Sequence, residues 1–205
     1  MKIIGCGSGR CGTKSFARLI DRQKDWTCTH EKFPILPWKK SEILFKRRIE
    51  YFENRRKVGD VAFYYLPYLE EIIGKLKNLK VLCLKRDIHS TVQSFMAKMK
   101  DTHPPRNHWI DHEGEKWTKD PIYDKACPNY RLNIDLNPSE YKRELIKKYW
   151  HDYYEKAEWL SDVYPNKFKI YPIDVLNDRG LQKEMFDFID IQNPNIKAGI
   201  KKNES

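Results

Sequence analysis

The sequence has no hydrophobic run long enough to span a bilayer, and no charged leader precedes an apolar segment at its start. It also lacks internal repeats and low-complexity tracts. With 205 residues, 40% apolar and 13% aromatic content, the chain can bury one substantial core. We therefore expect a mature, cytoplasmic protein with a single domain over residues 1–205 and no transmembrane segment.

The cysteines lack the spacing of a disulfide framework or a zinc site. They are few and scattered, with no C-x-x-C pair. The five are Cys6, Cys11, Cys28, Cys83 and Cys127. His103, His108 and His112, together with Cys127, could suggest a metal site, but their spacing matches no strong metal signature. We predict that the protein binds no metal.

Basic residues outnumber acidic residues by 39 to 29, which gives a formal net charge of +10. This charge suits an anionic ligand, although excess basic residues are often only a solvated surface. Residues 41–57 combine apolar residues at helical spacing with six basic residues. These are Lys46, Arg47, Arg48, Arg55, Arg56 and Lys57. We interpret them as the outer face of a helix; the alternative is a docking surface for a sulfated, carboxylated or phosphorylated acceptor.

The sequence contains no recognisable nucleic-acid-binding motif, so no nucleic-acid partner is expected. The sequence does not indicate an oligomeric state.

Strand and helix patterns alternate along the chain, which predicts an α/β fold with three layers: a mainly parallel central sheet flanked by helices. Strands are expected at residues 1–6, 26–30, 58–64, 79–85 and 167–171. Helices are expected at residues 12–23, 41–56, 66–77, 88–100, 139–162 and 179–190. Pro67 and Pro138 are expected to open helices, and Asp87 and Asp178 to cap them.

Residues 101–138 interrupt this alternation with prolines and aromatic residues. A long irregular stretch in a compact domain is usually a lid, a binding loop or a disordered segment. Because Trp109, Trp117 and Tyr130 provide apolar area to pack, we expect an insertion that covers the ligand crevice and selects the acceptor.

The first apolar strand leads through Gly7, Gly9 and Gly12 into a helix. This pattern predicts a loop whose backbone N–H groups bind a phosphate or sulfate. An ATP-binding loop has Lys directly after its last Gly and a magnesium-binding hydroxyl next. Here Thr13 and Lys14 hold those places, which argues against a magnesium-dependent NTPase. Arg10 instead provides a planar cation that can bind two anionic oxygens.

The segment Gly9-Arg10-Cys11-Gly12-Thr13 resembles the phosphosulfate loop of sulfotransferases that use 3′-phosphoadenosine-5′-phosphosulfate (PAPS). A second segment, in which Arg86 ends an apolar strand and Ser94 follows on a helix, is similar to the site at which this family binds the 3′-phosphate. The resemblance implies a P-loop-like sulfotransferase fold, with PAPS as donor, PAP as product and no metal. The donor-binding residues that it implies are Gly9, Arg10, Cys11, Gly12, Thr13, Lys14, Ser15, Arg86 and Ser94.

Sulfuryl transfer needs a clamp on the donor, stabilisation of the leaving phosphate and a base for the acceptor. By the same resemblance, Arg10 contacts the leaving phosphate. The charge of Lys14 in the same segment can also stabilise that phosphate as a cation near the bridging oxygen. The base is expected just after the second strand, where the resemblance favours Glu31 and keeps His30 as the alternative. The acceptor is expected to be a carbohydrate or another small molecule.

Two other classes of function stay open: a P-loop kinase for nucleotides or small molecules, and a basic nucleic-acid-binding module. The order of residues after Gly12 disfavours the kinase. The family's late Arg-Lys-Gly motif is not found, so either Lys201 and Lys202 or another basic residue replaces it, or the contact is absent.

Overall fold

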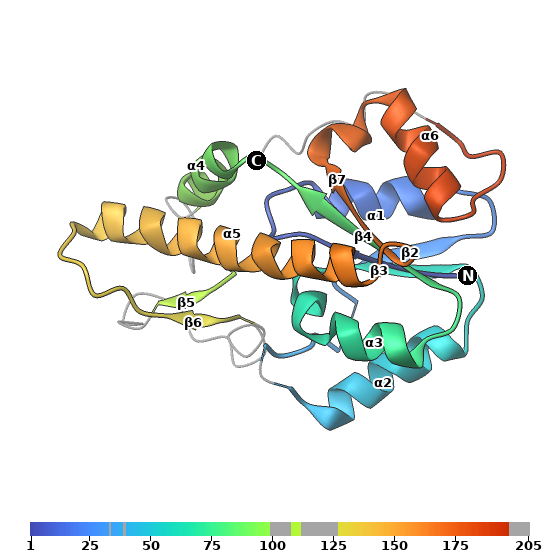
Figure 1. Cartoon of the computed structure of the whole chain (residues 1–205), viewed down its shortest axis with the longest axis horizontal. Coiled ribbons are helices and arrows are strands. Elements are labelled where there is room, and N and C mark those ends of the chain that lie inside the picture. The colour runs from blue at the N-terminus through green and yellow to red at the C-terminus, as the bar shows by residue number, and fades with distance from the viewer. Residues whose placement is uncertain (33, 39, 99–107, 112–126, 197–205) are drawn as a thin grey trace.

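Five parallel strands form the central sheet in the order β2-β3-β1-β4-β7 (Figure 1). This computed structural model describes residues 1–32, 34–38, 40–98, 108–111 and 127–196. The strands are β1 (Lys2–Cys6), β2 (Thr27–His30), β3 (Val58–Val61), β4 (Leu79–Lys85) and β7 (Phe168–Pro172). Because β1 lies between β3 and β4, the strand order reverses there, and such a reversal forms a ligand crevice at the carboxyl ends of the strands.

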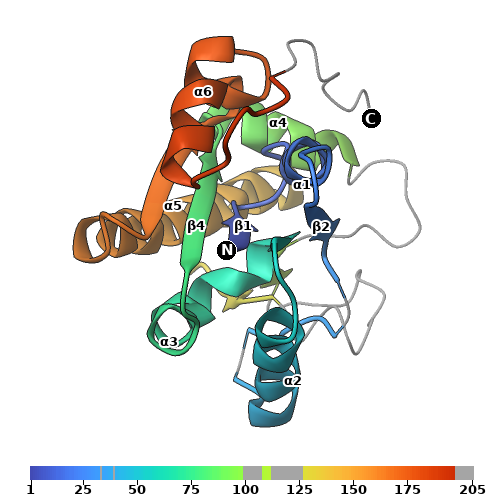
Figure 2. The same ribbon diagram turned by 90° about the vertical axis from the view of Figure 1, so that its right-hand side faces the viewer.

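Helices cover both faces of the sheet. The α-helices are α1 (Thr13–Asp21), α2 (Glu42–Glu53), α3 (Leu69–Lys75), α4 (Ile88–Lys98), α5 (Pro138–Val163) and α6 (Arg179–Phe188). Two 3-10 helices, η1 (Phe63–Tyr68) and η3 (Ile173–Leu176), follow β3 and β7. Helices α1 and α6 lie on one face, and α2, α3 and α5 lie on the other (Figure 2). The three-layer α/β fold predicted from the sequence is confirmed.

Neighbouring residues of the central strands are buried on opposite faces. Ile3 of β1 and Leu82 of β4 pack with α1 and α6, whereas Ile4 and Val81 pack with α3 and α5. All four side chains are fully buried. Because both faces of a parallel sheet are covered, its strands are apolar at nearly every position, which is why they were detectable in the sequence.

Most of the predicted helix starts are confirmed. Pro138 is the first residue of α5, whose N-cap Asn137 accepts from the backbone of Ser139 and Glu140. The Asp178 side chain caps α6, and Asp87 Oδ1 accepts the Ser90 N–H at 2.8 Å.

The expected helix start at Pro67 is wrong. Pro67 lies inside η1, and α3 begins at Leu69. The apolar run from Phe63 turns directly out of β3 into the core, and a 3-10 turn tolerates the fixed φ of proline.

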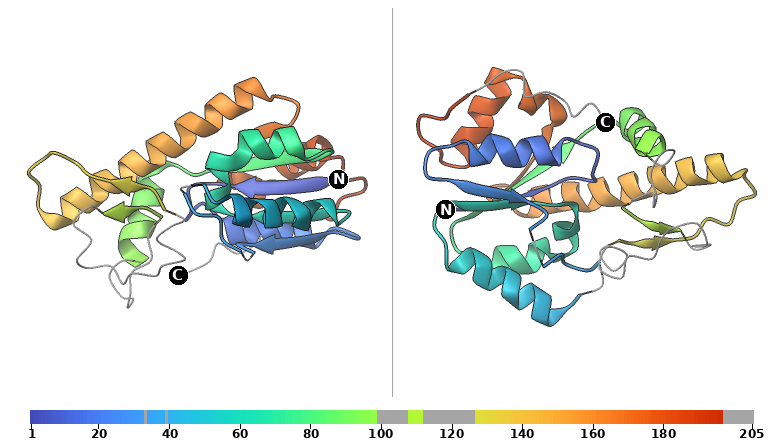
Figure 3. Two further views of the ribbon diagram at one scale, coloured as in Figure 1. Left: turned by 90° about the horizontal axis from the view of Figure 1, so that it is seen from below. Right: turned by 180° about the vertical axis from the view of Figure 1, so that it is seen from behind.

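The 101–138 insertion is described at 108–111 and 127–138, and the rest of it lies outside the described residues. Strands β5 (Ile110–Asp111) and β6 (Asn129–Tyr130) pair in parallel beside the N-terminal half of α5 (Figure 3). Trp109 is fully buried, with its ring centroid 5.1 Å from that of Phe95. Trp117, His103, His112, Lys201 and Lys202 also lie outside the described residues. Within the described part of the chain, no helix is both long and apolar enough to cross a membrane.

Candidate functional site

The glycine-rich loop connects the carboxyl end of β1 to the start of α1. Gly9 and Gly12 both have a φ of 84°, in the left-handed region. A Cβ atom at Gly12 would lie 2.6 Å from Leu176 Cδ1, and one at Gly9 would lie 2.5 Å from the ring of His108. Both positions therefore need glycine, because of backbone conformation and because of close packing.

Helix α1 presents its N-terminus to this loop. Its first internal hydrogen bond joins the Phe16 N–H to the Gly12 carbonyl at 2.9 Å, so the preceding amides have no partner within the helix. Such amides, with the helix dipole, form an anion-binding site. Thr13 and Ser15 are buried at this end, whereas Lys14 is exposed.

The side chain of Cys11, a residue of the loop, is fully buried. Burial raises the pKa of its thiol to about 11, so the side chain stays uncharged at neutral pH. A Cβ atom added to Gly7 would lie only 2.5 Å from the Cys11 Sγ. The side chain of Cys11 therefore packs under the loop, which leaves its backbone as the part available to an anion.

Two tyrosines of α5 support the loop from below. The Tyr153 hydroxyl accepts from the Gly7 N–H at 3.0 Å and donates to the Phe63 carbonyl at 2.9 Å. The Tyr154 hydroxyl donates to the Leu84 carbonyl at 2.7 Å and lies 3.3 Å from Ser8 Oγ. No local pattern in the sequence links these tyrosines of α5 to a loop 146 residues earlier.

The residues of the second sequence segment lie against the loop. Arg10 Nε donates to Ser94 Oγ at 2.9 Å, and Arg86 Nη1 donates to the Arg10 carbonyl at 3.0 Å. Arg86 directly follows β4, and Ser94 lies on α4. The Trp150 indole N–H donates to the Arg86 carbonyl at 3.0 Å, which fixes the chain there. The structure thus brings together the two segments that were singled out in the sequence.

This cluster is strongly cationic. Burial lowers the pKa of Arg10, and the nearby Arg86 guanidinium lowers it further. Two guanidinium groups so close together favour an anion of more than one charge between or beside them. A hollow of about 490 Å³ adjoins Arg86 and is walled by Trp150, Ile170 and Pro172.

His30 and Glu31, the two candidate bases, lie beside the start of α1. His30 Nε2 is 3.1 Å from Thr13 Oγ1 and 4.0 Å from Glu31 Oε1. Burial lowers the pKa of His30; the charge of Asp60 opposes this effect and that of Lys14 adds to it. His30 is therefore neutral at pH 7 and has a lone pair to accept a proton. Both side chains keep partial exposure, 25% for His30 and 32% for Glu31.

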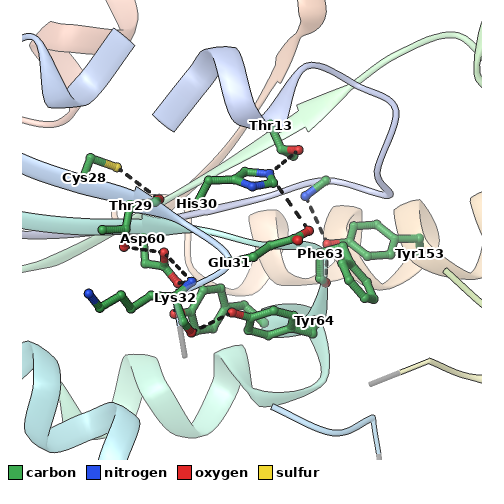
Figure 4. A network of polar contacts seen from close by, with 12 residues as sticks. Thr13, Cys28, Thr29, His30, Glu31, Lys32, Asp60, Phe63, Tyr64 and Tyr153 are labelled. Carbon is green, nitrogen blue, oxygen red and sulfur yellow. Dashed lines mark hydrogen bonds and ion pairs between the residues drawn. The ribbon is translucent and has the colours of Figure 1, made fainter. Parts of the chain in front are cut away.

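Asp60, which Figure 4 shows in contact with Thr29 and Lys32 on either side of these two residues, forms a buried ion pair with Arg48. Arg48 Nη1 is 3.4 Å from Asp60 Oδ2, and the two side chains are 1% and 0% exposed. The interpretation of Arg48 as part of an outer helix face is wrong, although Lys46, Arg47 and Arg55 of the same stretch are exposed. Asp60 lies inside β3. A charged residue within an apolar strand was the signal that could have identified it.

His108 is a site residue that the sequence did not identify. It comes from the 101–138 insertion and lies against Gly9, with its ring centroid 4.0 Å from that of Phe63. Burial lowers its pKa to about 3, and the charge of Arg10 contributes. The insertion therefore contacts the glycine-rich loop through an uncharged imidazole.

Comparison with known proteins identifies the fold. No protein-family model and no curated protein matches the chain. Among solved structures, the chain is similar to the mouse sulfotransferase SULT7A1, crystallised in complex with PAP. The TM-score is 0.57 at 14% identity, over 93% of this chain. This chain spans 59% of the length of that structure. The five-stranded parallel sheet with its flanking helices is therefore the α/β fold seen in a sulfotransferase.

Proposed function

We propose that this protein is a sulfotransferase that moves a sulfuryl group from PAPS to a hydroxyl or amine of a carbohydrate or other small molecule. The observation that carries the proposal is the contact of Arg10 with both Ser94 and Arg86. These contacts place Arg86 and Ser94 next to the anion-binding loop. PAPS carries phosphate groups at two ends, so a protein that binds it needs two neighbouring anion sites. The likeness of the fold to a sulfotransferase crystallised with PAP supports the same conclusion.

In this proposal the loop and the start of α1 bind the phosphosulfate, with backbone amides from Gly9 to Ser15 as hydrogen-bond donors. Arg86 and Ser94 bind the 3′-phosphate. Arg10 touches both positions through its backbone and side chain. It is permanently charged at neutral pH and therefore acts as an electrostatic clamp, not as a proton donor. The exposed Lys14 lies on the open side of the loop, where it can help to neutralise the leaving phosphate.

In the chemical step, the acceptor oxygen or nitrogen attacks the sulfur, and the bond from sulfur to the bridging phosphate oxygen breaks. PAP leaves with the electron pair of that bond, and Glu31 or His30 takes the acceptor proton. Thr13, at the junction of the loop with α1, lies 3.1 Å from His30 Nε2, so the candidate bases are close to the position where the sulfuryl group would bind.

Calorimetry with PAP tests the proposal most directly. We expect wild-type protein to bind PAP without added metal, Arg86→Ala to abolish detectable binding, and Ser94→Ala to weaken it. Gln93→Ala, which changes an exposed residue of the same helix, is the matched control and should bind normally. Correctly folded wild-type protein that does not bind PAP would overturn the proposal.

The same measurement separates the two rival functions. A P-loop kinase would bind ATP with magnesium and would not respond to PAP. A nucleic-acid-binding module would bind single or double strands tightly at moderate salt, would lose that binding steeply at high salt, and would ignore both nucleotides.

A further inference from the structure

We propose that Asp60, paired with Arg48, is a positioning residue that fixes the turn carrying His30 and Glu31. The inference rests on the proposed function, because it assigns these two residues to the reacting end of the site. Asp60 is fully buried and therefore not accessible to a bound ligand. It acts through the backbone and side chains on both sides of the candidate bases.

The carboxylate of Asp60 binds the residues that flank the two candidate bases. Its Oδ1 accepts from Thr29 Oγ1 at 2.6 Å and from the Lys32 N–H at 3.2 Å (Figure 4). Thr29 directly precedes His30, and Lys32 directly follows Glu31. One oxygen atom of a buried side chain therefore holds both ends of the turn.

The turn needs such restraint because its backbone is strained. Glu31 has a φ of 54°, in the left-handed region that is unfavourable for a residue with a Cβ atom. The Glu31 N–H donates to the Val61 carbonyl at 3.1 Å, so β3 holds this conformation at the backbone as well. A non-glycine residue persists in this region only where its surroundings fix it.

Arg48 extends the restraint to the following segment. It donates to the carbonyls of Lys32 and Pro34 while it pairs with Asp60. The Tyr65 hydroxyl adds a hydrogen bond of 2.6 Å to Asp60 Oδ2. A buried ion pair contributes little net stability compared with apolar packing, but removal of one partner is strongly destabilising. These contacts therefore serve to hold one conformation of the chain more than to add net stability.

The same carboxylate also sets the electrostatic environment of His30. Burial is the largest effect on the pKa of His30 and lowers it. The charge of Asp60, on β3, raises this pKa, whereas the charge of Lys14, on α1, lowers it. Glu31 Oε1 is 4.0 Å away on the turn, and the charge of His30 reaches His108 in the insertion. Neutralising Asp60 removes the influence that favours protonated His30.

Three variants test this role. Asp60→Asn removes the charge with little change of shape, Thr29→Val removes one hydrogen bond to Oδ1, and Tyr65→Phe removes one to Oδ2. For each we measure PAP binding by calorimetry, kcat for conversion of PAPS to PAP with a monosaccharide as acceptor, and the titration of His30 by NMR, assigned with His30→Gln. Thr27→Val changes an exposed residue of β2, the strand of Thr29, and is the matched control for Thr29→Val.

We expect Asp60→Asn to keep the Kd for PAP within about 3-fold and to lower kcat by at least about 10-fold, as expected when a catalytic group is misplaced. The His30 titration should move to lower pH. Thr29→Val should lower kcat less, and Thr29→Ser should restore most of that loss. Thr27→Val should change none of the three readouts.

An unchanged kcat and an unchanged His30 titration in Asp60→Asn would overturn the positioning role. If that variant does not fold, Thr29→Val and Tyr65→Phe decide in its place by the same two readouts. Failure of the proposed function looks different, because wild-type protein would then not bind PAP. The NMR titration still tests the control of His30 by Asp60 in that case.

Discussion

Arg10 Nε lies 2.9 Å from the hydroxyl oxygen of Ser94, a residue 84 positions later in the chain, and donates a hydrogen bond to it. The sequence placed these residues in two separate segments and assigned Arg10 to the leaving phosphate. The contact turns the Arg10 guanidinium toward the position proposed for the 3′-phosphate. Both parts of the proposed donor site therefore depend on Arg10.

The first prediction concerns the geometry of that guanidinium. Arg10→Lys keeps the charge but loses the planar group that reaches Ser94. Because a hydrogen bond to a charged group contributes about 1.5–3 kcal/mol, we expect PAP binding to weaken by about 10- to 100-fold, measured by calorimetry. Arg18→Lys, on the exposed side of α1, serves as control. Normal PAP affinity with lost turnover would instead restrict Arg10 to the leaving phosphate.

The second prediction concerns Gly12. Gly12→Ala forces a Cβ atom into the left-handed region and against Leu176, so we expect the free energy of unfolding to fall by about 2–4 kcal/mol. Gly74→Ala is the matched control, because nothing lies within 4 Å of its added Cβ atom in α3. It should stabilise the protein by about 0.5–1 kcal/mol. Urea unfolding measures both, and equal effects would contradict the argument.

The third prediction concerns the support of the loop by α5. Tyr153→Phe removes hydrogen bonds to the Gly7 N–H and the Phe63 carbonyl, so we expect about 1–3 kcal/mol of lost stability in urea unfolding and weaker PAP binding. Tyr154→Phe should affect the loop less, because its contact with the Ser8 N–H is longer, at 3.5 Å. Unchanged PAP binding in Tyr153→Phe would show that the loop keeps its shape without this support.

The fourth prediction concerns pH. The pKa of His108 falls from 6.5 to about 3 on folding, mainly through burial. Between these values the unfolded chain binds a proton that the folded chain does not. The free energy of unfolding should therefore fall as pH is lowered through this window, by up to about 1.4 kcal/mol per pH unit, with no such effect above pH 6.5.

Urea unfolding of His108→Asn against wild type isolates this contribution from the carboxylates that titrate in the same range. The variant should have a shallower pH dependence of stability. His89→Gln changes an exposed histidine of α4 and should keep the wild-type slope. Identical slopes in all three proteins would mean that His108 is not buried as described.

The fifth prediction concerns the base. Because the resemblance to sulfotransferases favours Glu31, we expect Glu31→Gln to lower kcat by about 100- to 10,000-fold and His30→Gln to lower it less. PAP binding should stay normal in both, and Glu53→Gln, exposed on α2, should behave as wild type. A larger loss in His30→Gln would assign the proton transfer to His30.

Local features of the sequence determined much of the fold. The strand before Gly7, the glycines that need positive φ and the position of Arg86 after an apolar strand are all set by neighbouring residues. Helix caps such as Asp178 act over three residues and were predictable for the same reason. The end of β3 was harder to predict, because the apolar residues of β3 continue into η1 without a change in composition.

The tertiary structure alone decided which distant residues support the site. In the sequence, Arg48 is one of several basic residues in the 41–57 stretch. In the folded protein its Nη1 lies 3.4 Å from Asp60 Oδ2. Tyr153 and His108 likewise reach the loop from segments far away in the chain. Sequence patterns report periodicity and neighbours within a few residues. A contact across the sheet or from an insertion depends on packing, which no local pattern records.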